Sequence, residues 1–126
     1  MIVGIGTDIV EIEKLRLAMV RRGDRLRNRA FTEGEIAYCE ERASRYQHYA
    51  VRFAAKEAVM KALGHGWGAK VCWLDIEVAR ARSGKPEIVL HDKTAQLAAE
   101  LGIRRWALSI THTKDHGLAF VVAQDE

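Results

Sequence analysis

The order of the hydrophobic periodicities constrains the fold of this chain more than any other feature. Residues 2–10 alternate like a strand, and helical patterns follow at 12–22, 32–42 and 44–64. Strand patterns return at 73–80 and 87–91, and a helix at 92–102 precedes a hairpin at 105–112 and 117–123. Because helices cluster early and strands late, the chain is predicted to be an α+β protein with an antiparallel sheet.

Capping residues predict where several of these helices begin and end. Thr32 with Glu35 and Ser44 with Gln47 each have the spacing of a capping box. Asp92 is placed to cap the next helix, and Gly64 is placed to end the long one. A turn at 83–86 is predicted to join the strands 73–80 and 87–91.

Length and composition favour one globular domain spanning residues 1–126. The chain is 48% hydrophobic, yet no apolar run approaches the roughly 18 residues of a membrane helix. The first residues have neither the basic start nor the apolar core of a signal peptide, which predicts a cytoplasmic protein. Cys39 and Cys72 are too few for a disulfide framework and are expected to be reduced.

Positive charge is concentrated in one segment. Seven of the 20 basic residues lie between 14 and 29, where Asp24 is the only acidic residue, although the net charge of the chain is only +3. Such a block predicts an acidic partner, which could be nucleic acid, an anionic membrane or a protein. A solvated helix face is the plainer alternative. Nucleic acid is disfavoured because no aromatic residue accompanies the basic ones.

Asp8 and Glu57 are carboxylates where hydrophobic residues are expected. Asp8 is on the strand face that carries Gly4 and Gly6, so it needs a partner, a metal or a proton, unless it caps a turn at the strand end. Glu57 falls on an apolar side of its helix, although an ordinary i,i+4 pair with Lys61 is the alternative. If both point inward they could share Mg²⁺, which typically takes one or two carboxylates.

Six segments resemble the holo-acyl-carrier-protein synthase family of 4′-phosphopantetheinyl transferases, in order and across nearly the whole chain. They are GIGTDIVEIEKL at 4–15, FTEGEIAYC at 31–39, RFAAKEAVMKALG at 52–64, WLDIEV at 73–78, SGKPEIVL at 83–90 and SITHTKDHGLAFVV at 109–122. The first and third are the most specific. The GHGWG segment at 64–68 departs from the pattern typical of the family.

The resemblance implies a magnesium-dependent transfer of the phosphopantetheine arm of coenzyme A to a serine of an acidic acyl carrier protein. Asp8 and Glu57 would hold Mg²⁺, and Lys61 would neutralise phosphate charge beside them. Coenzyme A would further contact Gly64, the loop Gly84-Lys85-Pro86, and Thr111 with His112. The carrier would dock on Lys14, Arg21, Arg22, Arg25, Leu26 and Phe53. A homotrimer with active sites between subunits is also implied, with no nucleic acid and no membrane as partner.

One alternative remains at this stage, a coenzyme A or nucleotide-binding module without catalysis. Such a module would need the glycines and the basic groups but not two inward carboxylates. Asp8 and Glu57 therefore favour the enzyme.

Overall fold

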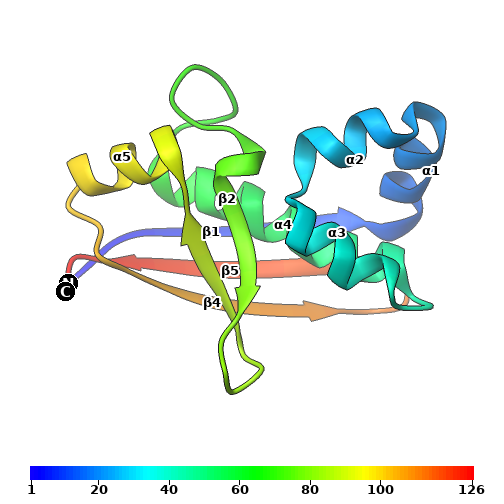
Figure 1. The fold of residues 1–126 in the computed structure, drawn as a ribbon. Helices are drawn as coiled ribbons and strands as arrows, with labels where there is room; N and C mark the ends of the chain where they lie inside the picture. The colour runs from blue at the N-terminus through cyan, green and yellow to red at the C-terminus, as the bar shows by residue number, and fades with distance from the viewer.

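A computed structural model describes all residues, 1–126, and has the α+β architecture predicted from the sequence. The strands β1, β5 and β4 form an antiparallel sheet in that order, and β2 and β3 form a separate hairpin. Figure 1 shows α1, α2 and α3 gathered at one end of the molecule and both chain termini at the other. The elements are β1 (Ile2–Glu11), α1 (Ile12–Arg22), α2 (Asp24–Ala30), α3 (Glu33–Glu40), α4 (Arg45–Leu63), the 3₁₀ helix η1 (Trp73–Asp75), β2 (Ile76–Arg80), β3 (Pro86–Leu90), α5 (Asp92–Glu100), β4 (Arg105–His112) and β5 (His116–Gln124).

Helix α4 packs directly on β1 because two glycines let the backbones meet. A Cβ atom on Gly6 would lie only 1.8 Å from the carbonyl oxygen of Ala58, and one on Gly4 would lie 2.5 Å from that of Ala62. Both distances are far inside van der Waals contact. Glycines inside a strand often mark close approach by a ligand or another backbone, and here the approaching backbone is that of α4.

Several predicted boundaries are confirmed, and others are wrong for local reasons. Thr32 and Glu35 form the complete capping box of α3, and Gly64 ends α4 in the left-handed conformation. Ser44 precedes α4 but makes no capping hydrogen bond. Residues 73–75 form a 3₁₀ helix rather than the start of a strand. Helix α2 was not predicted. Its basic residues continue the basic segment of α1, and the sequence predicts that Gly23 ends the helical pattern rather than separating two helices.

The cap of α5 is supplied by another element. His91, not Asp92, is the N-cap residue, and Asp92 has φ 49°, a conformation that non-glycine residues rarely adopt. Asp75 of η1 does the capping instead, since its Oδ2 accepts hydrogen bonds from the backbone N–H of Thr94 at 3.2 Å and from its hydroxyl at 3.0 Å. A long-range contact therefore replaces the predicted local one.

A buried ion pair ties α3, α4 and β2 together. Lys56 of α4 is fully buried, and Arg52 of the same helix is only 2% exposed. The Lys56 ammonium donates to Glu35 Oε1 at 2.7 Å and to backbone carbonyls of η1 and β2. Glu35 Oε2 accepts from the N–H of Val78 at 2.9 Å. Because both charges are paired, their burial is tolerable.

None of the helices combines the length and apolarity that crossing a lipid bilayer would require.

Candidate active site

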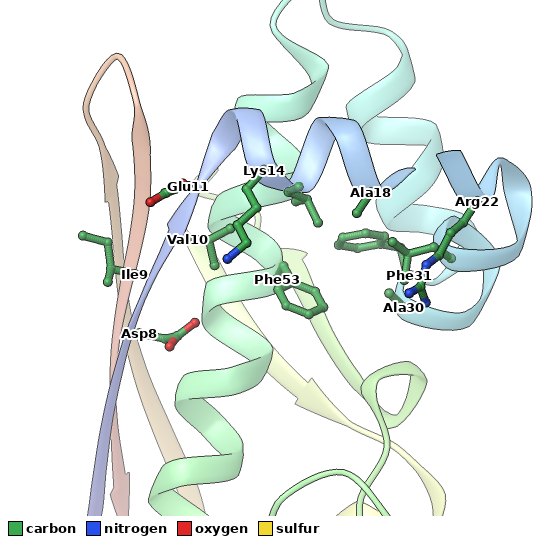
Figure 2. Close-up of a pocket in the computed structure, with 12 residues that line it drawn as sticks. Asp8, Ile9, Val10, Glu11, Lys14, Ala18, Arg22, Ala30, Phe31 and Phe53 are labelled. Carbon is green, nitrogen blue, oxygen red and sulfur yellow. The ribbon is translucent and has the colours of Figure 1, made fainter. Parts of the chain in front are cut away.

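Asp8 lies in the middle of β1, so the alternative in which it caps a turn at the strand end is wrong. Its side chain is 20% exposed, and Oδ1 accepts a hydrogen bond from Lys61 Nζ at 3.0 Å. The same ammonium donates to the carbonyl of Thr7 at 2.9 Å. Figure 2 shows Asp8 pointing towards α4, away from the side taken by Ile9. A strand carboxylate is thus held against a helix by a lysine of that helix.

Glu57 lies one turn before Lys61 on α4 and is partly buried. The predicted alternative, an ordinary salt bridge between the two, is not formed, since the lysine pairs with Asp8. Glu57 Oε2 instead accepts a hydrogen bond from the indole N–H of Trp73 at 3.4 Å. Asp8 and Glu57 each keep one carboxylate oxygen that accepts no hydrogen bond from the protein. Those two oxygens are available to a ligand.

The chemistry of the two carboxylates fits Mg²⁺. No cluster of three or more potential ligands from His, Cys, Asp and Glu occurs in the chain. Zinc commonly requires three or four such side chains, whereas Mg²⁺ is usually held by one or two carboxylates and completes its shell with water and substrate phosphates. Asp8 and Glu57, each with an unpaired carboxylate oxygen, are ligands of the kind that Mg²⁺ takes.

A cavity of about 400 Å³ opens beside Glu57 and Lys61. The loop after α4 forms much of its wall, and the lining residues are Glu57, Met60, Lys61, Gly64, His65, Gly66, Trp67 and Trp73. The N–H of Gly64 bonds to the carbonyl of Lys61 at 3.2 Å, as in an ordinary helix C-cap. Of the α4 residues that line this cavity, Lys61 is the only basic one.

A second cavity, of about 500 Å³, lies under α1 on the other side of Phe53 and includes Asp8 (Figure 2). Its walls are mainly apolar, with Lys14 and Arg22 among them. An adjoining cavity of about 420 Å³ is lined by Arg21, Arg22, Arg25, Leu26 and Arg29. The structure therefore brings the predicted carrier-docking residues together around two neighbouring cavities, which share Arg22 and Leu26.

The other predicted coenzyme A contacts are not joined to Asp8 and Lys61. Gly84, Lys85 and Pro86 lie at the turn between β2 and β3, where Arg80 Nη1 donates to the Gly84 carbonyl at 2.7 Å. Thr111 and His112 are exposed at the end of β4. No hydrogen bond or ion pair connects either group with the Asp8–Lys61 pair.

Three arginines around Tyr38 form a basic cluster that the sequence did not reveal. Their guanidinium carbons lie 3.3, 4.1 and 4.6 Å from the ring centroid, for Arg42, Arg52 and Arg80 respectively. Arg52 is buried, and its Nε has no hydrogen-bond partner. Burial, followed by the charges of these arginines, lowers the pKa of His48. Arg42 follows α3, Arg52 is on α4 and Arg80 is on β2, so the three arginines meet only in the folded chain.

Comparison with known proteins identifies the family. Residues 4–121 match the model of the 4′-phosphopantetheinyl transferase superfamily. The holo-[acyl-carrier-protein] synthase of Solibacter usitatus is 48% identical over 99% of this chain and 100% of its own length. The crystal structure of the Neisseria meningitidis synthase superposes with a TM-score of 0.91 at 35% identity, over 98% of this chain and 99% of that one. A Bacillus anthracis synthase, in complex with coenzyme A (3′,5′-ADP), gives a TM-score of 0.82 at 34% identity, over 100% and 99%. The chain therefore belongs to the 4′-phosphopantetheinyl transferase superfamily, among the holo-[acyl-carrier-protein] synthases.

Proposed function

We propose that Asp8, Glu57 and Lys61 form the centre at which this chain, a holo-[acyl-carrier-protein] synthase, transfers phosphopantetheine from coenzyme A to a carrier serine. The observation that carries the proposal is the Lys61–Asp8 bond one helical turn from Glu57, with Glu57 and Lys61 lining a cavity, in a chain of this family. Holo-carrier protein is what fatty acid biosynthesis uses, so the reaction belongs to that metabolism. We take residues 1–126 as one transferase domain, and the cytoplasmic location stays a prediction from the sequence.

Asp8 and Glu57 would hold Mg²⁺ through their unpaired carboxylate oxygens. When bound, the ion would neutralise charge on the pyrophosphate of coenzyme A and orient it. Lys61 is 57% exposed while bonded to Asp8, so its ammonium can also meet a phosphate oxygen. Two positive groups on the same phosphates match the electrostatic stabilisation that phosphoryl transfer needs.

The chemical step follows from that placement. The carrier serine oxygen attacks the phosphorus that bears the pantetheine arm. The bond from this phosphorus to the bridging oxygen breaks, and adenosine 3′,5′-bisphosphate leaves with the electron pair. The serine proton passes to a water molecule beside Asp8 or Glu57, and Lys61 balances the charge on the leaving phosphate.

Mass spectrometry of apo-acyl carrier protein tests the activity. Incubation with this protein, coenzyme A and Mg²⁺ is expected to add the mass of one phosphopantetheine group, and a chelator is expected to prevent the addition. If the carrier stays unmodified while a known synthase modifies it, the chain would instead be a coenzyme A-binding module. If the mass of the carrier still increases when the chelator is present, the transfer would not require Mg²⁺.

A homotrimer would complete the site by bringing the two separate groups of coenzyme A contacts together. Gly84, Lys85, Pro86, Thr111 and His112 of one subunit would face the Asp8 centre of its neighbour. An apolar sheet face supports this assembly. Ile5 and Ile9 of β1 are each 59% exposed, and Phe120 of β5 is 42% exposed on the same face. Large contiguous apolar surfaces of this kind usually mark interfaces, and we propose that further copies of the chain cover this one.

The double variant Ile5→Asp, Phe120→Asp is expected to be monomeric and inactive, because two buried charges would have no partners in the interface. Analytical ultracentrifugation measures the mass, and the carrier assay measures the activity. Leu101→Asp is the control, since Leu101 is 45% exposed at the end of α5, outside the sheet. A double variant that keeps the native mass would show that this face is not the interface.

An acidic carrier protein would dock over α1 and α2. Lys14 and Arg22 lie on the cavity that contains Asp8 and Phe53, while Arg21 and Arg25 line the adjoining one with Leu26. Basic groups around an apolar opening suit a negatively charged helix that inserts an apolar side chain. Such charges mainly steer and orient a partner.

Charge reversal of Arg21 and Arg25 is expected to raise KM for the carrier about ten-fold or more, with little change in coenzyme A affinity. The reason is repulsion between the acidic carrier and a surface that has lost its positive charge. Steady-state kinetics with varied carrier concentration measures the effect, and added salt should reduce the difference. Arg104→Glu, at the opposite end of the molecule, is the control. Unchanged carrier kinetics would remove these arginines from the docking surface.

A further inference from the structure

Arg29 connects two parts of the molecule to which the proposed function assigns different substrates. Its side chain lines the cavity of about 420 Å³ that holds Arg21 and Arg25. Its guanidinium carbon also lies 4.6 Å from the ring centroid of Trp67, in the loop after α4. That loop forms the wall of the cavity beside Glu57. One side chain thus contacts both the surface proposed for the carrier and the loop next to the proposed reaction centre.

The guanidinium of Arg29 is free to bind an anion while it lies over the indole. Arg27 of the same helix pairs with Asp24, whereas Arg29 is exposed and forms no ion pair with the chain. A guanidinium over an aromatic ring still presents N–H donors at its edge, and their fork suits a carboxylate. A carboxylate of the carrier bound at that edge would therefore hold Arg29 against Trp67.

The loop after α4 has few other contacts that fix its conformation. A Cβ atom on Gly66 or Gly68 would meet nothing within 4 Å, and neither glycine has a positive φ. Packing and backbone geometry therefore do not require glycine there, and glycine increases the number of conformations open to the loop. The N–H groups of Trp67 and Ala69 make no backbone hydrogen bond. The Trp67 side chain is thus one of the few groups that hold the loop in place.

We infer that Arg29 is a positioning residue, which couples docking of the carrier to ordering of the loop after α4. A bound carrier would fix Arg29, and through it Trp67, so the loop would lose its freedom once for both substrates. Coenzyme A would then bind more tightly with the carrier present, and by linkage the carrier would bind more tightly with coenzyme A present. The inference rests on the proposed function, which places the carrier at the arginines and coenzyme A beside Glu57 and Lys61.

Phe53 offers a second route between the two sites. It lines the cavity under α1, and its ring centroid lies 5.4 Å from that of Trp73. Trp73 in turn lies 5.8 Å from Trp67 and donates to Glu57 Oε2 at 3.4 Å. Phe53 and Trp73 are partly buried against the core, however, whereas Arg29 is exposed and can leave the indole. Coupling requires an element with two arrangements, so the structure favours Arg29.

Hydrogen exchange of the whole protein, followed by mass spectrometry, tests the coupling without coenzyme A. The probe is acyl carrier protein whose acceptor serine is replaced by alanine, so that it binds but is not modified. Peptides from residues 64–72 are expected to exchange about five-fold more slowly at saturating carrier. Arg29→Gln should abolish this protection, because glutamine has neither the charge nor the guanidinium. Arg25→Gln is the matched control, since Arg25 lines the same cavity. It should weaken carrier binding but preserve the protection at saturation.

Calorimetric titration with coenzyme A and Mg²⁺ measures the coupling between the substrates. The affinity of the wild-type protein for coenzyme A is expected to rise about five-fold when the same carrier is added. Arg29→Gln should show no rise, although its affinity without the carrier stays close to the wild-type value. Arg29→Lys keeps the charge but loses the planar guanidinium, so it is expected to behave like Arg29→Gln.

Loop protection that persists in Arg29→Gln would overturn the inference, since another contact would then couple the two sites. Full coupling in Arg29→Lys would overturn it as well, because charge alone would be sufficient. A wild-type loop that the bound carrier leaves unprotected would also contradict it. An unmodified carrier in the mass spectrum would by itself disprove the proposed function. A modified carrier together with an unprotected loop would disprove only the role of Arg29.

Discussion

Asp8→Asn and Glu57→Gln are each expected to reduce kcat for carrier modification by at least about 100-fold, the scale on which one stabilising group of a transition state counts. An amide has nearly the shape of the carboxylate but lacks its charge, so each variant loses affinity for Mg²⁺ while the side chain still fits. In the carrier assay the product peak should nearly vanish at wild-type enzyme concentration.

Two further measurements separate loss of metal from loss of fold. Titration with Mn²⁺, followed by electron paramagnetic resonance, should show weaker metal binding in both variants in the presence of coenzyme A. The melting temperatures should stay close to the wild-type value, because neither residue is fully buried. Glu33→Gln, which changes an exposed carboxylate of α3, is the matched control. Wild-type turnover in either variant would contradict the assignment of its residue to the metal.

Lys56→Met is expected to lower the free energy of unfolding by about 3–5 kcal/mol, the usual cost of leaving one member of a buried ion pair alone. Glu35 and Lys56 both have no exposed side-chain surface, and Lys56 Nζ lies 2.7 Å from Glu35 Oε1. Burial lowers the pKa of Lys56, and the charge of Glu35 opposes that shift. Denaturation with urea measures the loss.

The double variant Glu35→Gln, Lys56→Met should recover part of that stability, because the carboxylate left unpaired is also removed. Lys114→Met, in the exposed turn between β4 and β5, should change stability by less than about 0.5 kcal/mol. A Lys56→Met protein as stable as the Lys114→Met control would contradict the proposed contribution of the Glu35–Lys56 ion pair to the free energy of unfolding. Lys56 directly precedes Glu57 on α4. If Lys56→Met loses more activity than its unfolded fraction accounts for, the Glu35–Lys56 ion pair also positions Glu57.

Local patterns were sufficient to predict most of the elements. The alternation of β1, the capping box of Thr32 and Glu35, and the end of α4 at Gly64 depend on neighbours within a few residues, and all three are confirmed. The sequence segments also identified the family, which the comparisons confirm. The Asp8–Lys61 contact was not predicted as such, but both residues had been assigned to one site.

By itself, the sequence determined the α+β class, most element boundaries and the residues proposed for catalysis, because periodicity and capping are local and the family segments are continuous. Tertiary structure alone decided that Lys56 is buried, that Asp75 rather than Asp92 caps α5, and that three arginines surround Tyr38. It also decided that Gly4 and Gly6 admit a helix. Each of these features depends on contacts between residues that are distant in the sequence. Those contacts, rather than the neighbouring residues in the chain, set the free energy of a buried charge or of a glycine at a close approach.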